Sequence, residues 1–189
     1  GTDNTILLPE MVSALQATGK KFDFMLFDAC YMGTAEVCYD FTDVVDYQLV
    51  SAMEVPAYGF PYNTDLLVNL FEGTVDGYTK ACQEFVDYYE EVYEDGEQAW
   101  ATIALVDSKE VNNLTQQIKN QITQHKETLA DFDVSSLQEY GQSTAPNIAS
   151  DLRQFVEELN GGEVPSEFDA QLNKTVLFKD CMEIARPSN

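Results

Sequence analysis

The fold is decided by the stretch FDFMLFDACYMG, which runs from Phe22 to Gly33. Its residues 22–29 form an almost continuous apolar run with an Asp near each end. Such a run is typical of a strand that is buried on both faces, as in a parallel sheet. The segment from Gly33 to Phe41 then has helical spacing, with Thr34 as its expected N-cap. The stretch therefore predicts a buried strand followed closely by a helix.

The neighbouring segments extend this unit into an alternation of helices and strands. We expect further helices at 8–17, 63–71, 78–93, 108–129, 148–159 and 168–172, and further strands at 45–53, 99–106 and 175–178. Residues 54–62, rich in Pro, Gly and aromatics, and the polar residues 131–147 are expected to be loops. The alternation predicts an α/β sandwich whose mostly parallel sheet is flanked by helices.

The composition excludes several classes of function. The chain has 189 residues, with 33 Asp and Glu against 10 Lys and Arg for a formal net charge of -23, and a single histidine, His125. Nucleic acids and anionic membranes need a basic footprint, so neither is an expected partner, whereas a basic ligand suits an acidic surface. One histidine cannot form a multi-histidine metal site. No apolar run reaches the ~18 residues of a membrane helix.

The first residues, Gly1-Thr-Asp-Asn, have neither a Met nor a signal-peptide pattern. We therefore expect the sequence to be a fragment, with part of the function lying upstream. The length suits one domain or a large piece of one. Residues 1–189 are predicted to form a single domain that is incomplete without the upstream segment.

Cys30 is the best-placed nucleophile in the chain. It ends the predicted strand about three residues before the predicted helix. Active sites of open α/β sheets lie at such strand ends, and the amino end of a helix favours a thiolate. The four cysteines, Cys30, Cys38, Cys82 and Cys181, show no C-x2-C spacing. For each of them, a small buried core residue is the alternative interpretation.

Asp28 adds a second functional group beside Cys30. Residues two apart in a strand share a face and lie roughly 6.6 Å apart along its axis, so both side chains could point into one cleft. That separation is about the reach from a scissile carbonyl to the cationic end of the same Arg or Lys residue. One strand could thus hold both the nucleophile and the anion that selects a basic side chain. An Asp that caps the following helix is the alternative.

The residues around this pair resemble the clostripain-type cysteine peptidases. The match covers residues 8 to about 72 and includes Asp-Ala-Cys-x-Met-Gly at 28–33. It continues with Ser-x-x-Glu-x-Pro at 51–56 and a Gly-aromatic-Pro-Tyr turn at 59–62. Beyond this region the likeness lies in the order of helices and strands.

The resemblance implies a caspase-like α/β sandwich and a Cys–His dyad that cleaves after Arg or Lys. Cys30 would be the nucleophile, and its backbone N–H would help to stabilise the oxyanion. Asp28 would sit in the pocket for the basic side chain, and the segment from Ser51 to Glu54 would form part of the pocket. Several members carry an acidic residue near Tyr58, which this chain lacks. The resemblance also implies a secreted or cell-surface bacterial protein.

The catalytic histidine is the largest departure from the family pattern. The family places this residue upstream of the Cys, in a His-Gly loop that this chain does not contain. His125 lies on the apolar stripe of the helix predicted at 108–129 and is expected to be a buried structural residue. The resemblance therefore implies that an upstream segment or light chain of the same precursor supplies the general base after processing.

Two other interpretations stay open. One is a catalytically inactive caspase-like domain that binds basic partners through its acidic surface. The other concerns calcium, on which some relatives depend, although the sequence itself requires no cofactor. Calcium takes six to eight oxygens, and carboxylates are dense at Asp87, Glu90, Glu91, Glu94, Asp95 and Glu97. The spacing is not that of an EF-hand, which favours a solvated acidic helix face.

Overall fold

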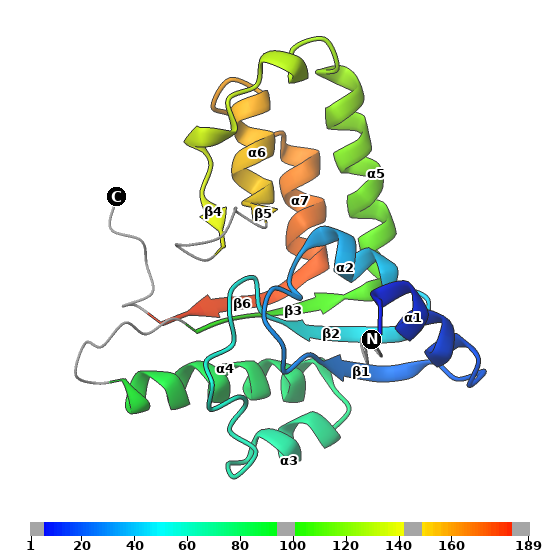
Figure 1. The fold of residues 1–189 in the computed structure, drawn as a ribbon, viewed down its shortest axis with the longest axis vertical. Helices are drawn as coiled ribbons and strands as arrows, with labels where there is room; N and C mark the ends of the chain where they lie inside the picture. Colours follow the sequence, from blue (N-terminus) through cyan, green and yellow to red (C-terminus); the bar gives the residue numbers. More distant parts are fainter. Residues whose placement is uncertain (1–5, 94–100, 142–148, 183–189) are drawn as a thin grey trace, which may run out of the picture.

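The centre of the molecule is a four-stranded sheet. A computed structural model describes the chain at residues 6–93, 101–141 and 149–182. The strands lie in the order β1 (Phe22–Leu26), β2 (Val45–Val50), β3 (Thr102–Asp107) and β6 (Val176–Cys181). The α/β architecture with a central sheet flanked by helices, predicted from the sequence, is confirmed (Figure 1).

The prediction of a mostly parallel sheet is wrong for these four strands. β1 and β2 are parallel, with Phe22 opposite Val45, whereas β2–β3 and β3–β6 are antiparallel. The connections explain the difference. One helix between two strands returns the chain to the end at which the first strand began, and α2 (Ala35–Asp40) does so between β1 and β2. Two packed helices, α3 (Leu66–Phe71) and α4 (Val75–Val92), bring the chain back to the end at which β2 finished.

The remaining elements are helices and short extended pieces. They are α1 (Leu8–Gln16), α5 (Ser108–Gln124), η1 (Leu129–Asp131), η2 (Val134–Ser136), β4 (Glu139–Tyr140), β5 (Ala149–Ser150), α6 (Leu152–Leu159) and α7 (Ser166–Thr175). The helix predicted from residue 148 thus begins at Leu152. Ala149 and Ser150, which were predicted to be helical, instead form β5 and pair with β4. Asp151 accepts a hydrogen bond from the Gln154 N–H at 2.8 Å, which caps α6.

Helices cover both faces of the sheet. The side chains of Leu49, Ile103 and Leu105 point toward α3 and α4 and form one buried cluster with residues such as Phe85. On the opposite face, Val45 and its neighbours pack against α1 and α2 and against the start of α5. Figure 1 shows α3 and α4 on one side of the sheet and α2 and α5 on the other. Burial of a side chain such as Phe85 stabilises the fold by about 1.5–3 kcal/mol.

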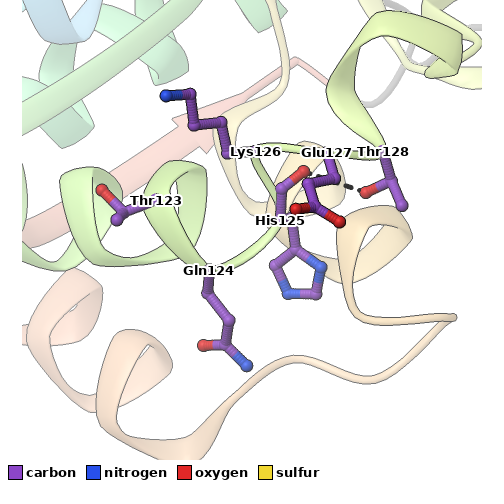
Figure 2. A pocket seen from close by; sticks show the side chains of 6 residues that line it. All are labelled: Thr123, Gln124, His125, Lys126, Glu127 and Thr128. Carbon is purple, nitrogen blue, oxygen red and sulfur yellow. Dashed lines mark hydrogen bonds between the residues drawn. The ribbon is translucent and has the colours of Figure 1, made fainter.

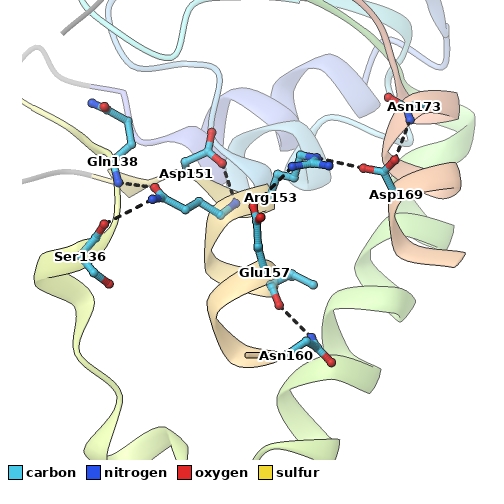
Figure 3. A network of polar contacts seen from close by, with 10 residues as sticks. Ser136, Gln138, Asp151, Arg153, Glu157, Asn160, Asp169 and Asn173 are labelled. Atoms are coloured by element: carbon cyan, nitrogen blue, oxygen red, sulfur yellow. Dashed lines mark hydrogen bonds and ion pairs between the residues drawn. The ribbon is translucent and has the colours of Figure 1, made fainter. Parts of the chain in front are cut away.

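α5, α6 and α7 form a helical group that extends away from the sheet (Figure 1). Leu114, Val156 and Phe168 form its small core. Arg153 of α6 donates to Asp169 of α7 at 2.9 Å, within the network of polar contacts in Figure 3. An exposed ion pair of this kind adds at most about 1 kcal/mol, so the apolar contacts hold the group together. In the part of the chain that the structure describes, no helix has the length and apolar character needed to span a bilayer.

Candidate active site

The predicted nucleophile lies in a turn that follows β1. The strand ends at Leu26, so Asp28 and Cys30 lie beyond it rather than within it, and the prediction that β1 extends to residue 29 is wrong. Both residues are exposed. Tyr31 follows in the left-handed conformation, with φ of 60°, which is uncommon for a residue with a side chain and marks a tightly constrained turn.

Backbone hydrogen bonds hold this turn against the segment that follows β2. The Tyr31 N–H donates to the Met53 carbonyl at 2.9 Å, and the Gly33 N–H donates to the Ser51 carbonyl at 2.7 Å. A Cβ added at Gly33 would lie 2.7 Å from the Ala52 nitrogen and 2.9 Å from the Ser51 carbonyl oxygen. Only glycine permits this approach, which accounts for the Gly of the Asp-Ala-Cys-x-Met-Gly pattern.

The Cys30 sulfur contacts the backbone of Val55. The Val55 N–H donates to Sγ at 3.4 Å, and the Val55 carbonyl oxygen lies 3.8 Å from Sγ as an acceptor for the thiol. The sequence predicts that the amino end of the following helix faces the sulfur. α2 begins five residues later, at Ala35, where Thr34 caps it as predicted by accepting from the Val37 N–H at 3.3 Å. Among the described residues, the Val55 amide is therefore the donor that contacts the sulfur.

Asp28 is held by the loop between β2 and α3. The Tyr62 hydroxyl donates to Asp28 Oδ2 at 3.0 Å. Gly59, with φ of 68°, approaches so closely that an added Cβ would lie 2.9 Å from Oδ2 and 3.2 Å from Oδ1. Burial, followed by the hydrogen bond and charge of Asp28, raises the pKa of Tyr62 to about 12, so the phenol remains a donor at neutral pH.

Tyr89 of α4 holds that loop through its hydroxyl group. Its fully buried hydroxyl donates to the Gly59 carbonyl at 2.6 Å and lies 3.4 Å from the Pro56 carbonyl. Gly59 also donates its N–H to Pro56 at 2.8 Å, which closes the turn. Burial is the main cause that raises the pKa of Tyr89, so its hydroxyl stays protonated. A long-range contact from α4 thus positions the turn that contacts Asp28.

Ser51 and Glu54, the other predicted site residues, are held inside the site. Ser51 is completely buried, and its hydroxyl lies 2.8 Å from the Thr102 hydroxyl at the start of β3. The same oxygen accepts from the Met53 N–H at 3.2 Å. Glu54 is half-buried beside Tyr31. Burial raises the pKa of Tyr31, and the charge of Glu54 and its hydrogen bond to the hydroxyl raise it further.

The four cysteines differ sharply in exposure. Cys30 is exposed and Cys181 is partly exposed, whereas Cys38 and Cys82 are buried. Burial raises the pKa of the Cys38 and Cys82 thiols from 9.0 to about 12, so these two stay protonated. The interpretation of a small core residue is confirmed for these two and excluded for Cys30.

His125 lies far from this turn. It is the C-cap of α5, just beyond the helix, and its Nε2 is 3.2 Å from Asn160 Oδ1. The side chain is half-buried beside a shallow pocket of about 330 Å³ at that end of the helix (Figure 2). The predictions that this helix runs to residue 129 and buries His125 are therefore wrong, since α5 ends at Gln124. The predicted apolar stripe, which included Ile122, is only partly correct, because Ile122 is exposed and the polar Gln121 is buried in its place.

The acidic cluster proposed for calcium is only partly described. Asp87, Glu90 and Glu91 are exposed on α4, while the other three carboxylates lie outside the described residues. Among residues 6–93, 101–141 and 149–182, no group of three or more His, Cys, Asp or Glu side chains could hold a metal ion.

The sequence does not predict the contacts that four residues make in the site, namely Tyr62, Gly59, Tyr89 and Val55. Tyr62 and Gly59 stand in the Gly-aromatic-Pro-Tyr turn, so the motif marked them without assigning a contact. Tyr89 lies among other aromatic residues of α4 and gave no signal, since it reaches the site only through tertiary packing. Val55 acts through its backbone, which a residue pattern does not reveal.

Several solved structures are similar to the chain over nearly its whole length. A clostripain from Bacteroides thetaiotaomicron in complex with the peptide inhibitor BTN-VLTK-AOMK is 29% identical, with a TM-score of 0.75 over 97% of this chain and 78% of that one. A secreted C11 cysteine protease from the same species, iotapain, is 30% identical, with a TM-score of 0.74 over 93% of this chain and 48% of that one. No curated protein matches the chain.

A third structure, an inactive zymogen C11 protease from Parabacteroides distasonis, is 29% identical, with a TM-score of 0.73 over 92% of this chain and 47% of that one. These structures and the described architecture agree on a caspase-like fold and support a cysteine peptidase. The model of the clostripain family matches residues 1–181. The chain therefore belongs to the clostripain family.

Proposed function

We propose that the protein is a cysteine endopeptidase that cleaves after Arg or Lys, with Cys30 as its nucleophile and Asp28 as the anion that contacts the basic side chain. The observation that carries this proposal is the turn after β1, which presents an exposed thiol and an exposed carboxylate two residues apart. Backbone and side-chain contacts from residues 51–62 hold both groups. The family assignment supports the same chemistry.

The reaction would follow the usual course of thiol-dependent acyl transfer. The Cys30 thiolate attacks the scissile carbonyl carbon, and the tetrahedral intermediate collapses with cleavage of the C–N bond. A histidine takes the thiol proton and later gives it to the leaving amine. Water then hydrolyses the thioester, which releases the carboxylic acid and restores the thiol. The Val55 N–H, 3.4 Å from Sγ, stabilises the thiolate before attack.

We place the histidine on a segment that packs along the open edge of β1, whether in the same chain or in a processed light chain. Two features support this. In the described sheet β1 pairs on one side only, with β2. Beside it, α3 exposes Val68 at 64% and Phe71 at 77%, and Phe71 contacts the half-buried Phe24 of β1 with ring centroids 6.1 Å apart. An apolar surface next to a free strand edge suits an added strand. Residues 1–189 and this segment would form one domain.

Ser51 and Glu54 would shape the pocket from within. The Ser51 hydroxyl, bonded to Thr102, would set the course of the segment that carries Val55. Glu54, beside Tyr31, would fix the conformation of the residue after the nucleophile. We propose further that the protein is secreted, as the relative iotapain is described to be, and that hydrolysis requires no metal. Activity unchanged by a chelator would agree with the last point, and loss restored by calcium would contradict it.

The test compares hydrolysis of matched peptide amides that carry Lys, Arg or the neutral norleucine before the cleaved bond. The full-length protein should cleave the two basic peptides at least about tenfold faster than the neutral one, given the strength of charged hydrogen bonds. Cys30→Ala should abolish all hydrolysis, while Cys181→Ala, at the other accessible cysteine, should retain it. Full activity in Cys30→Ala would refute the proposal, and an unchanged preference in Asp28→Asn would remove Asp28 from its role.

A second candidate is a non-enzymatic domain that binds basic partners. The net charge of -23 and a lone histidine remote from Cys30 favour it. This candidate expects the full-length protein to bind basic peptides with no turnover and with the same affinity in Cys30→Ala. Hydrolysis that depends on Cys30 would exclude it.

A further inference from the structure

The region around Asp28 offers few free hydrogen-bond acceptors to a bound cation. Oδ2 of Asp28 already accepts from the Tyr62 hydroxyl at 3.0 Å, whereas no donor among the described residues reaches Oδ1. Gly59 covers the carboxylate, since an added Cβ would lie within 3.2 Å of both oxygens. The Pro56–Gly59 turn itself contains Ala57 and Tyr58, neither of which brings a second carboxylate.

Three backbone carbonyls of the same loop, those of Pro56, Gly59 and Phe60, accept hydrogen bonds from inside the protein. Pro56 accepts from the Gly59 N–H at 2.8 Å, and Gly59 accepts from the Tyr89 hydroxyl at 2.6 Å. Phe60 accepts from the Tyr62 N–H at 2.8 Å. These carbonyl groups therefore point to internal donors. A bound cation would therefore contact mainly Asp28, and chiefly its Oδ1 oxygen, which does not accept from Tyr62.

The two basic side chains make different demands on such a site. A guanidinium presents five N–H donors in a planar fork, and it binds a carboxylate best when both oxygens accept in parallel. An ammonium is a compact charge with three donors that can turn toward one oxygen and water. A single carboxylate with one oxygen already occupied suits the ammonium better.

We propose that Tyr62 makes this subsite selective for Lys over Arg, by engaging Oδ2 of Asp28 and so weakening the second of the two parallel hydrogen bonds that a guanidinium would make. The inference rests on the proposed function, which it deepens by naming the preferred side chain. Tyr62 acts through Asp28 and is therefore a positioning residue. The raised pKa of its phenol keeps it protonated, so the contact persists throughout the neutral range.

The ratio of kcat/KM for matched Lys and Arg peptides tests the proposal. In the full-length protein we expect the Lys peptide to be favoured by about tenfold, the value of one hydrogen bond to a charged group. Tyr62→Phe removes only the hydroxyl. The ratio should fall below about threefold, chiefly because KM for the Arg peptide decreases while kcat is retained.

Tyr58→Phe is the matched control, because Tyr58 lies in the same loop, is 69% exposed and makes no hydrogen bond among the described residues. Its ratio should equal that of the unmodified protein. Equal rates on Lys and Arg peptides before mutation, or the same ratio in Tyr62→Phe, would overturn the inference. If neither basic peptide is cleaved faster than its norleucine counterpart, the proposed function fails instead. The wild-type ratio needs no variant, so a folding defect in Tyr62→Phe cannot decide the result.

Discussion

Replacing Gly59 by alanine should separate the alignment of Asp28 from the stability of the fold. Gly59 and Gly73 have the same left-handed φ of 68°. An added Cβ at Gly73 meets nothing within 4 Å, whereas at Gly59 it lies 2.9 Å from Asp28 Oδ2. Gly73→Ala therefore reproduces the backbone strain of Gly59→Ala without its contact, which makes the two variants a matched pair.

The structure gives different magnitudes for stability and for catalysis. Each alanine in the left-handed region costs about 1–2 kcal/mol of folding free energy. The extra contact at Gly59 adds little to that, because the Asp28 carboxylate is the end of an exposed side chain and can move away. Its movement breaks the hydrogen bond from Tyr62, now 3.0 Å long. The displaced carboxylate is then no longer aligned with the ammonium of a bound Lys. A hydrogen bond between charged groups of this kind is worth about 1.5–3 kcal/mol, so kcat/KM for a Lys peptide should fall at least about tenfold.

Two measurements on both variants check this reasoning. Urea denaturation should give both variants the same loss of unfolding free energy, to within about 0.5 kcal/mol. Peptide hydrolysis should show that only Gly59→Ala loses activity on the Lys peptide, with little change for norleucine. The reasoning is refuted if Gly73→Ala loses as much Lys activity as Gly59→Ala, or if Gly59→Ala keeps the full preference for Lys over norleucine.

Three further predictions concern the interior of the site and the core. Gly33→Ala should lower the unfolding free energy in urea by about 1–3 kcal/mol and impair hydrolysis, because its Cβ would lie within 2.9 Å of backbone atoms; a native-like variant would contradict this. Ser51→Ala should lower the unfolding free energy by about 1–2 kcal/mol, because it leaves the Thr102 hydroxyl unpaired. Adding Thr102→Val should recover part of that free energy. If the losses of the two substitutions are strictly additive, the two hydroxyl groups are not coupled. Folding raises the pKa of the Cys38 and Cys82 thiols from 9.0 to about 12, so their contribution to the unfolding free energy should be constant below pH 9 and should fall above it, by up to about 1.4 kcal/mol per pH unit for each thiol. Urea denaturation that gives the same unfolding free energy at about pH 9 and about pH 10.5 would count against it.

The sequence predicted best what neighbouring residues determine. The prediction of Thr34 as a helix N-cap is confirmed, since its side chain accepts a backbone amide. The apolar run before Cys30 correctly predicted β1, although the strand ends at Leu26 and Asp28 and Cys30 lie beyond it. Periodicity was a weaker guide in α5, where Ile122 is exposed although it fits the apolar stripe.

Strand direction and the contacts of Asp28 could not be predicted, because both depend on distant parts of the chain. An apolar strand has the same pattern in a parallel or an antiparallel pair when both its faces are covered. The partner of Asp28, Tyr62, lies 34 residues away, and Tyr89 reaches Gly59 across 30 residues. The Gly-aromatic-Pro-Tyr motif includes both Gly59 and Tyr62, but it does not indicate that both residues contact Asp28.

The backbone hydrogen bonds between the Cys30 turn and the end of β2 have a consequence for how the protein loses activity on heating. β2 is an interior strand with neighbours on both sides, so its end opens only when the sheet opens. The Gly33 amide donates to Ser51, the first residue after that strand, and the Tyr31 amide donates to Met53, two residues further on. Both amides should then exchange with solvent deuterium nearly as slowly as those of the sheet itself. The nucleophile would keep its geometry up to the global transition. Inactivation and unfolding should therefore share one midpoint, with no cooler phase in which a folded protein has lost its site.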